Sequence, residues 1–234
     1  MVFSAQNEQH MDFYVHNTSW KPVDFDGIKL MKHLEKNCFS SQSELKPGFS
    51  NAAKREMGRK RRNSLNVTSY VLIDIETTGL SPEKDDIIEI GALEINNDEV
   101  SSERGWLIQN EKNIPIEIQK LTGIDNVMLE KQGVWLSNVL NELFELIRGK
   151  NVFIYNASFD LSFLENSAKK YGLEFPEIHV KDILSTAKSR IKGLDNYRLE
   201  TVSSYLGIEK RQCHRALDDC RMLYEVCNKL NKIG

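Results

Sequence analysis

From about residue 69 onward, hydrophobic residues are concentrated in short runs that are separated by polar turns. Residues 69–76 and 87–95 are rich in β-branched side chains, and the turn-forming stretch GLSPEKDD lies between them. This pattern predicts two adjacent β-strands, and we expect a third strand at residues 105–108. Sequential strands therefore open the folded part of the chain.

Apolar side chains then recur at helical spacing. In residues 134–148 they recur at steps of three and four and leave a polar face, which predicts an amphipathic helix. We expect further helices at residues 158–171, 199–206 and 216–230, a short strand at 151–155, and a strand followed by a helix around 178–189. Strands followed by alternating strands and helices predict an α/β domain with a mixed sheet flanked by helices.

The first 66 residues differ from the rest of the chain. Residues 1–65 hold 11 basic and 7 acidic side chains, whereas the remaining residues hold 20 basic and 27 acidic ones. One helix is plausible at 27–36, and the run KREMGRKRR at 54–62 has six basic residues. We interpret 1–66 as a partly disordered N-terminal extension with a basic linker, and 67–234 as the folded domain. The basic run is a solvated tether, a docking segment or a salt-dependent contact to nucleic-acid phosphates.

The composition excludes several classes of protein. Hydrophobic residues make up 40% of the 234 residues and charged residues 28%, with a net charge of -3, as in ordinary globular proteins. The four cysteines form no CxxC pair, so we expect free thiols in a reducing compartment, with those at 213, 220 and 227 in a helical core. No signal peptide or long apolar segment is visible. We expect a soluble, cytoplasmic protein without a membrane anchor.

Two carboxylates interrupt the first strand. Because side chains alternate along a strand, Asp74 and Glu76 project from one side, and Ile73 and Ile75 project from the other. Like charges at this spacing repel, and burial would make them costly. Either the strand lies at an edge and its acids face water, or a divalent cation compensates them.

A second acid follows the strand at 151–155. Asp160 falls in the first turn of the next expected helix, where the helix dipole stabilises a negative charge for purely structural reasons. Ligand sites of α/β sheets also open just beyond the ends of strands. Asp160 is therefore either a structural acid or a third member of the same site.

The segment HRALDDCRMLYEV supplies the remaining candidates. At about 100° per helical residue, Asp219 falls within the apolar stripe of the helix, and Asp218 falls on its solvated side. An aspartate on an apolar stripe needs a partner, which a cation shared with Asp74 and Glu76 would provide. His214 precedes the helix and is either a capping residue or part of the site.

Together these residues predict a hard, oxygen-rich metal site. Carboxylate ligands favour Mg²⁺ or Mn²⁺ over zinc, and two such ions are a common device for phosphodiester hydrolysis. His214, with a reference pKa near 6.5, is suited to act as general base. These residues alone indicate metal-dependent phosphoryl chemistry.

Three ordered motifs also resemble those of a known family. DIETTGL at 74–80, NASFD at 156–160 and HRALDD at 214–219 resemble the motifs of the DEDDh (DnaQ-like) 3′–5′ exonucleases, including the proofreading epsilon subunit of bacterial DNA polymerase III. The resemblance covers about residues 67–231. It implies a ribonuclease H-like fold, two Mg²⁺ or Mn²⁺ ions held by Asp74, Glu76, Asp160 and Asp219, and His214 as the base.

The resemblance also implies contacts to the terminal nucleotide. Thr77, Thr78, Asn156 and Phe159 occupy motif positions that meet the 3′ end in the family. Tyr155 and Thr122 stand where members often have histidine, which affects the expected substrate preference and leaves the metal ligands intact.

We therefore expect a 3′–5′ exonuclease that releases nucleoside monophosphates from single-stranded or frayed DNA, in proofreading or repair, with a polymerase as a possible partner. An RNA-trimming exonuclease remains open, since no residue visibly reads the 2′-hydroxyl. The sequence is also compatible with a non-catalytic polymerase-docking module and with an unrelated metal-dependent phosphatase.

Overall fold

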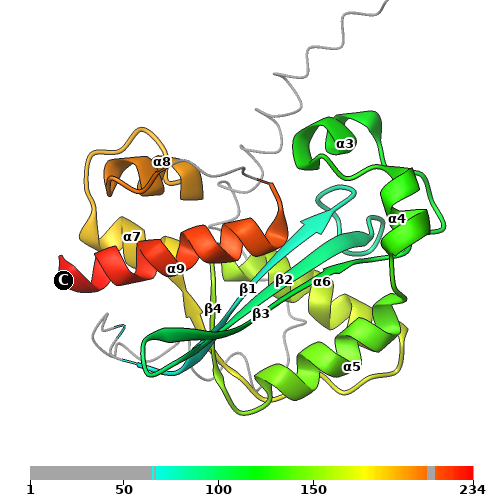
Figure 1. The fold of residues 1–234 in the computed structure, drawn as a ribbon, viewed down its shortest axis with the longest axis horizontal. Coiled ribbons are helices and arrows are strands. Elements are labelled where there is room, and N and C mark those ends of the chain that lie inside the picture. Colours follow the sequence, from blue (N-terminus) through cyan, green and yellow to red (C-terminus); the bar gives the residue numbers. More distant parts are fainter. Residues whose placement is uncertain (1–64, 66, 210–213, 234) are drawn as a thin grey trace, which may run out of the picture.

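The computed structural model describes residues 65, 67–209 and 214–233. Its centre is a five-stranded sheet in the order β3-β2-β1-β4-β5. The strands are β1 Tyr70–Thr77, β2 Ile87–Asn96, β3 Glu99–Leu107, β4 Asn151–Ile154 and β5 His179–Asp182. β2 is antiparallel to both β1 and β3, and β4 and β5 continue the sheet in parallel beyond β1. The expected mixed α/β sheet is thus confirmed (Figure 1).

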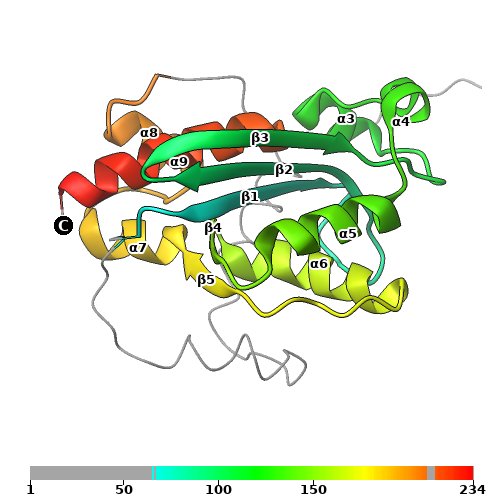
Figure 2. The same ribbon diagram turned by 60° about the horizontal axis from the view of Figure 1, so that its bottom comes forward.

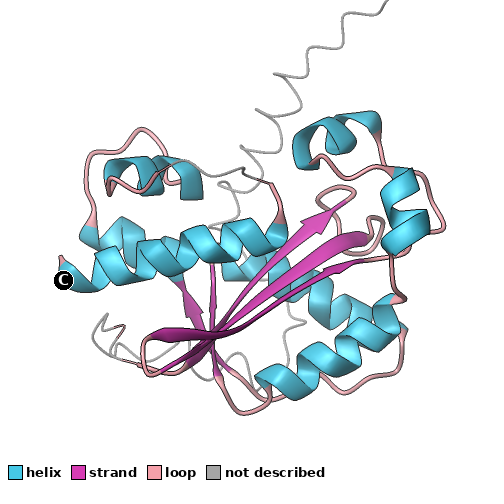
Figure 3. Ribbon diagram, viewed as in Figure 1, coloured by secondary structure: helices cyan, strands magenta, loops and turns pink. Residues whose placement is uncertain are grey.

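Seven helices are described around this sheet. They are α3 Ile116–Thr122, α4 Asn126–Gln132, α5 Leu136–Ile147, α6 Ala157–Lys170, α7 Ile183–Arg190, α8 Leu199–Tyr205 and α9 Ala216–Lys232. α9 lies across the three antiparallel strands (Figure 3). None of the described helices is long and apolar enough to cross a membrane.

Helices cover both faces of the sheet, with α5 and α6 on one side and α9 on the other (Figure 2), and the alternation of side chains along β1 divides the core into two layers. Val71, Ile73 and Ile75 pack with the apolar faces of α5 and α6. Tyr70 and Leu72 pack on the other side, with residues of α7, α8 and α9. β1 is therefore a central strand with both faces covered, and the interpretation as an edge strand is wrong.

A smaller core attaches α3 and α4 to the end of the sheet. Ile118 and Leu129 from these helices are buried against Ile88 of β2, together with Ile114 and Ile124. The sequence pattern did not predict either helix, because each has only seven residues and too few turns to display a clear period.

The third strand is longer than expected. It begins at Glu99 instead of residue 105, after a two-residue turn in which Asn97 and Asp98 have φ values of 54° and 64°. Such a turn matches the twist of the hairpin that it closes. Because β3 is an edge strand with mostly exposed side chains, its residues lack the apolar alternation on which the prediction relied.

The cysteines and the N-terminal segment have separate outcomes. Cys220 and Cys227 are buried and free, as expected for core thiols, whereas Cys38 and Cys213 lie outside the described residues. The same holds for the expected helix at 27–36, the basic run at 54–62 and nearly all of the expected N-terminal extension.

Candidate active site

Asp74 and Glu76 lie on the face of β1 that meets α9. In the antiparallel ladder Asp74 pairs with Gly91 of β2, and Glu76 pairs with Glu89. The alternation that sends Ile73 and Ile75 into one core therefore directs both carboxylates to the opposite side.

Asp160 comes from α6, which follows β4 directly. Asn156 precedes this helix in the left-handed conformation, with φ 64°, and turns the chain sharply from strand to helix. The Asp160 side chain is 3% exposed, and backbone hydrogen bonds involving Ile75 and Asp160 itself favour its charged form. The turn after β4 thus brings a third carboxylate to β1, since β4 and β1 are adjacent parallel strands.

The start of α9 supplies His214 and Asp219. His214 has φ 65°, and its backbone N–H donates to Asp219 Oδ2 at 3.0 Å. Its Nε2 lies 3.4 Å from Glu200 Oε1. Ligand-type atoms of Glu76, His214 and Asp219 all lie within 4.8 Å of one another. The structure therefore joins residues of the first and last motifs in one cluster.

Asp74 and Asp160 are not part of this three-residue cluster, but both interact electrostatically with the acids in it. Burial raises the pKa of Asp74 well above its usual range, and the charges of Asp219 and Asp160 raise it further. Burial also raises the pKa of Asp160 well above normal, with a further contribution from Glu76.

The cluster itself is similarly perturbed. Burial, followed by the charge of Asp219, raises the pKa of Glu76 to about 8, against a lowering effect of His214. Burial raises the pKa of Asp219 to about 6. A hydrogen bond to Glu200 raises the pKa of His214. The four acids repel one another, and the nearby positive groups, His214 and Arg215, do not offset the effect of burial on Glu76 and Asp219.

This donor set fits a divalent cation. Carboxylate oxygens are the ligands that Mg²⁺ and Mn²⁺ prefer, and a cation would relieve the repulsion that raises these pKa values. Glu76 and Asp219 have ligand atoms within 4.8 Å of each other, and the charges of Asp219 and Asp160 both act on Asp74. The arrangement can hold cations against a phosphodiester.

The residues expected to contact the terminal nucleotide surround the same end of the sheet. Thr77 Oγ1 donates to the carbonyl of Gly79 at 2.6 Å, and Thr78 Oγ1 accepts from the Asp86 N–H at 2.9 Å. The Asn156 N–H donates to Asp182 at 3.2 Å. The Phe159 ring packs 5.1 Å from that of Phe163. These partners hold the loops after β1 and β4 in place.

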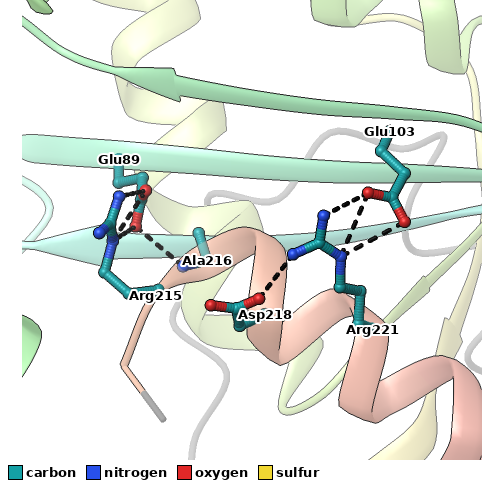
Figure 4. Close-up of polar contacts among 6 residues, drawn as sticks. All are labelled: Glu89, Glu103, Arg215, Ala216, Asp218 and Arg221. Atoms are coloured by element: carbon teal, nitrogen blue, oxygen red, sulfur yellow. Dashed lines mark hydrogen bonds and ion pairs between the residues drawn. The ribbon is translucent and has the colours of Figure 1, made fainter. Parts of the chain in front are cut away.

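Two residues beside the site were missed by the sequence analysis. Glu89 of β2 is buried, and its carboxylate accepts hydrogen bonds from the Arg215 guanidinium and from the Ala216 N–H (Figure 4). The signal was present, since Glu89 interrupts the run IIEIG just as Asp74 and Glu76 interrupt β1. A carboxylate in an apolar strand needs a partner, and Arg215 follows His214 directly.

Comparison with known proteins places these motifs in a family. The RNase T exonuclease model matches residues 71–227. The chain is 36% identical to DNA polymerase III PolC-type of Caldanaerobacter subterraneus subsp. tengcongensis, over 70% of this chain and 12% of the relative. It is 33% identical to the 3′-5′ exonuclease DinG of Bacillus subtilis, over 72% and 19%. The chain thus spans less than a fifth of either protein.

The match to a shorter relative covers most of that relative's length. The DNA polymerase III subunit epsilon of Aquifex aeolicus is 30% identical over 73% of this chain and 84% of the relative.

Solved structures share the fold. E. coli Exonuclease I in complex with a dA16 oligonucleotide has a TM-score of 0.62 at 17% identity, over 71% of this chain and 41% of that chain. The nuclease domain of 3′hExo, a DEDDh family member bound to rAMP, has a TM-score of 0.63 at 18% identity, over 73% and 95%. The chain therefore belongs to the RNase T exonuclease family, and its mixed sheet flanked by helices is the ribonuclease H-like fold of the DEDDh exonucleases.

Proposed function

We propose that this protein is a metal-dependent 3′–5′ exonuclease that hydrolyses DNA from its 3′ end and releases nucleoside monophosphates. The observation that carries the proposal is the cluster of Glu76, His214 and Asp219 beside the buried Asp160 and the partly exposed Asp74, in a member of an exonuclease family. No structural role of these residues accounts for so many opposed carboxylates at one place.

Asp74, Glu76, Asp160 and Asp219 would hold two Mg²⁺ or Mn²⁺ ions. When bound, two such ions supply positive charge that stabilises the attacking and leaving oxygens of a phosphodiester. The four carboxylates would give up their protons to bind the ions.

His214 would act as the general base. Its imidazole lies in the same cluster as Glu76 and Asp219, which are two of the proposed ligands of the ions. A histidine accepts a proton from water near neutral pH, and Glu200 at 3.4 Å stabilises the imidazolium that results. The proton leaves on His214 while the four carboxylates remain available to the ions.

Thr77, Thr78, Asn156 and Phe159 would frame the terminal nucleotide. Thr77 ends β1 and Thr78 follows it, and Asn156 and Phe159 lie at the start of α6, directly after β4. Phe159 is partly exposed and presents an aromatic ring to a base, and the loop backbone positions the sugar and phosphate.

DNA is the favoured substrate, and a DNA polymerase the favoured partner. The relatives PolC and subunit epsilon are named as components of DNA polymerase III, and DinG is named as a 3′-5′ exonuclease. This reasoning by relationship supports proofreading or repair. A role in RNA trimming is the competing outcome of the experiment below.

The experiment uses the full chain, freed of metal by chelation. Oligonucleotides labelled at the 5′ end, as single-stranded DNA, frayed duplex DNA and RNA of the same sequence, are incubated with and without Mg²⁺ or Mn²⁺. We expect a descending ladder on DNA that depends on the cation, and nucleoside monophosphates as products. A preference for RNA would replace the DNA assignment, and intact substrates under all conditions would refute nuclease activity.

Two variants separate chemistry from contamination. Asp74→Asn removes one proposed ligand of the ions and should abolish the ladder. Glu99→Gln changes an exposed carboxylate at the start of β3, remote in the sheet order from β4, and should retain it. Equal activity of both variants would point to a contaminating nuclease.

A further inference from the structure

Helix α9 begins without a cap of its own. Arg215 occupies the N-cap position, and its side chain makes no capping hydrogen bond. The first N–H groups of a helix have no partner within the helix and need acceptors from elsewhere. Here a residue 127 positions earlier provides one, since Glu89 Oε2 accepts from the Ala216 N–H at 2.9 Å.

The same carboxylate also holds Arg215. The Arg215 Nε lies 3.1 Å from both oxygens of Glu89, and Nη2 lies 2.8 Å from Oε1. Figure 4 shows the guanidinium facing this carboxylate while the helix start lies beside it. The Glu89 side chain is only 5% exposed. Both oxygens of a buried acid are thus committed to the first residues of α9.

Glu89 is also tied to the carboxylate cluster through the sheet. It pairs directly with Glu76 in the β1–β2 ladder, on the same face. Two residues farther along β2, Gly91 lies so close to Ala216 that a side chain there would overlap the helix backbone. β2 therefore fixes the start of α9 at two successive positions on the face that carries Glu76.

The position of the helix start decides where two site residues lie. His214 directly precedes Arg215, and Asp219 is joined to His214 by a backbone hydrogen bond. Both move with Arg215 and Ala216.

We propose that Glu89 and Arg215 form a positioning pair that fixes His214 and Asp219 against Glu76, and so sets the affinity for divalent cations and the rate of the chemical step. The pair touches neither the substrate nor the ions. The inference rests on the proposed exonuclease function for its kinetic part, while its cation-binding part is independent of any substrate.

The test uses Glu89→Gln in the full chain. Glutamine keeps the shape but cannot accept from both Arg215 and Ala216 through two oxygens. Loss of an outer residue that orients ligands typically lowers metal affinity or activity by about 10 to 100-fold. We expect kcat and Mn²⁺ affinity, the latter measured by electron paramagnetic resonance, to fall by about that factor, with KM for DNA nearly unchanged.

The same helix provides a matched control. Arg221, on the next turns of α9, is bound by Glu103 of β3 and by Asp218, at 2.6 Å to the latter (Figure 4). Glu103→Gln breaks a comparable pairing of α9 with the sheet, but on the side away from His214. This variant should keep kcat and Mn²⁺ affinity close to those of the unmodified protein.

Chemical rescue distinguishes positioning from general destabilisation. An open cavity of about 400 Å³ adjoins the pair and is lined by both Glu89 and Arg215. Arg215→Ala should therefore leave space in which added guanidinium ion binds Glu89. We expect low concentrations of guanidinium, but not the same concentrations of sodium or urea, to restore part of kcat and of Mn²⁺ affinity.

Each arm has an outcome that overturns the proposal. Unchanged kcat and Mn²⁺ affinity in a folded Glu89→Gln protein would refute it. So would a loss of activity that only follows the unfolded fraction, measured by circular dichroism. If Glu89→Gln does not fold, Arg215→Ala carries the test through rescue. Absence of nuclease activity in the unmodified protein would refute the proposed function and leave the Mn²⁺ measurements to decide this inference.

Discussion

The backbone N–H of His214 donates a hydrogen bond to the carboxylate of Asp219, at 3.0 Å from Oδ2. The bond closes the first turn of α9 and joins two proposed site residues into one unit. It also leaves the second oxygen, Oδ1, as the atom of Asp219 that can turn to a cation. One side chain thus fixes the backbone of His214 and carries an oxygen that is proposed to bind a cation.

Replacing Asp219 should separate these two roles. In Asp219→Asn the amide oxygen can still accept from His214, but an NH₂ group replaces the oxygen that would face a cation. The fold should persist while activity falls on the order of 10³-fold, because a cation supplies several kcal/mol of transition-state stabilisation. Steady-state kinetics on single-stranded DNA measure the loss.

The adjacent residue is the control for that variant. Asp218 is bound to Arg221 in a partly exposed ion pair on α9, so Asp218→Asn should change kcat by less than about twofold. Similar losses in both variants would contradict the assignment of Asp219.

Substitution of His214 should show whether this residue acts as a general base or as a metal ligand. If it removes a proton from water, His214→Ala lowers kcat by about 10² to 10⁴-fold, the usual contribution of general base catalysis. Mn²⁺ affinity should then remain within a few-fold of normal. A comparable loss of Mn²⁺ affinity would make His214 a metal ligand instead.

The buried acids predict an unusual dependence of stability on pH. Their folded-state pKa values are raised, to about 8 for Glu76 and about 6 for Asp219, above the ordinary values of 4.5 and 3.8. The folded protein therefore holds protons that the unfolded chain releases. Without metal, the contribution of these two groups to the free energy of unfolding should be greatest below about pH 4 and should decline as pH rises toward 8.

Divalent cations should reverse this decline. Because cations bind deprotonated carboxylates, the increase in Tm caused by Mn²⁺ should be larger at about pH 8 than at about pH 5.5. Scanning calorimetry of metal-free and Mn²⁺-loaded protein measures both effects. An equal increase at the two pH values would show that these carboxylates are not the binding site, and Glu76→Gln should weaken the trend.

Two glycines of the sheet should differ in their tolerance of a methyl group. In Gly91→Ala the added carbon would overlap the backbone of Ala216, so α9 must shift, at a cost of about 1 to 3 kcal/mol or more. In Gly105→Ala the nearest atom is a flexible Leu217 methyl at 3.6 Å. We expect a lowered Tm and lower activity only for the first variant. Equal Tm values would mean that α9 can move away from β2 at little cost.

Much of this site could be predicted from alternation and helical period alone. Asp219 falls on the apolar stripe of α9 and lies beside His214 and Glu76 in the structure, whereas Asp218 pairs with Arg221 at the surface. Strand alternation and helical period depend only on residues that are near one another in the sequence, so both can be read from the sequence. They assign a side chain to a face, and the face determines what it can meet.

Long-range partners were beyond those patterns. Glu89 and Arg215 are 126 residues apart, and nothing in the spacing of either residue indicates the other. The first half of β3 was not predicted for a different reason. It lies at the solvent-exposed edge of the sheet, where no alternation of apolar side chains is required. Short helices such as α3 are fixed by burial of Ile118 in a small core, and their own length carries little signal.

The proposed site residues come from both ends of the folded domain, so they are not synthesised at the same time. Asp74 and Glu76 are made early, but Asp219 and the bonds from Arg215 and Ala216 to Glu89 come from the last described helix. When β1 to β5 have been synthesised, the chain still lacks Asp219, the proposed fourth ligand, and His214, the proposed base. Closing this long loop is a late step in folding. With the proposed roles of His214 and Asp219, a growing chain could not hydrolyse nucleic acid until α9 docks on β1 and β2.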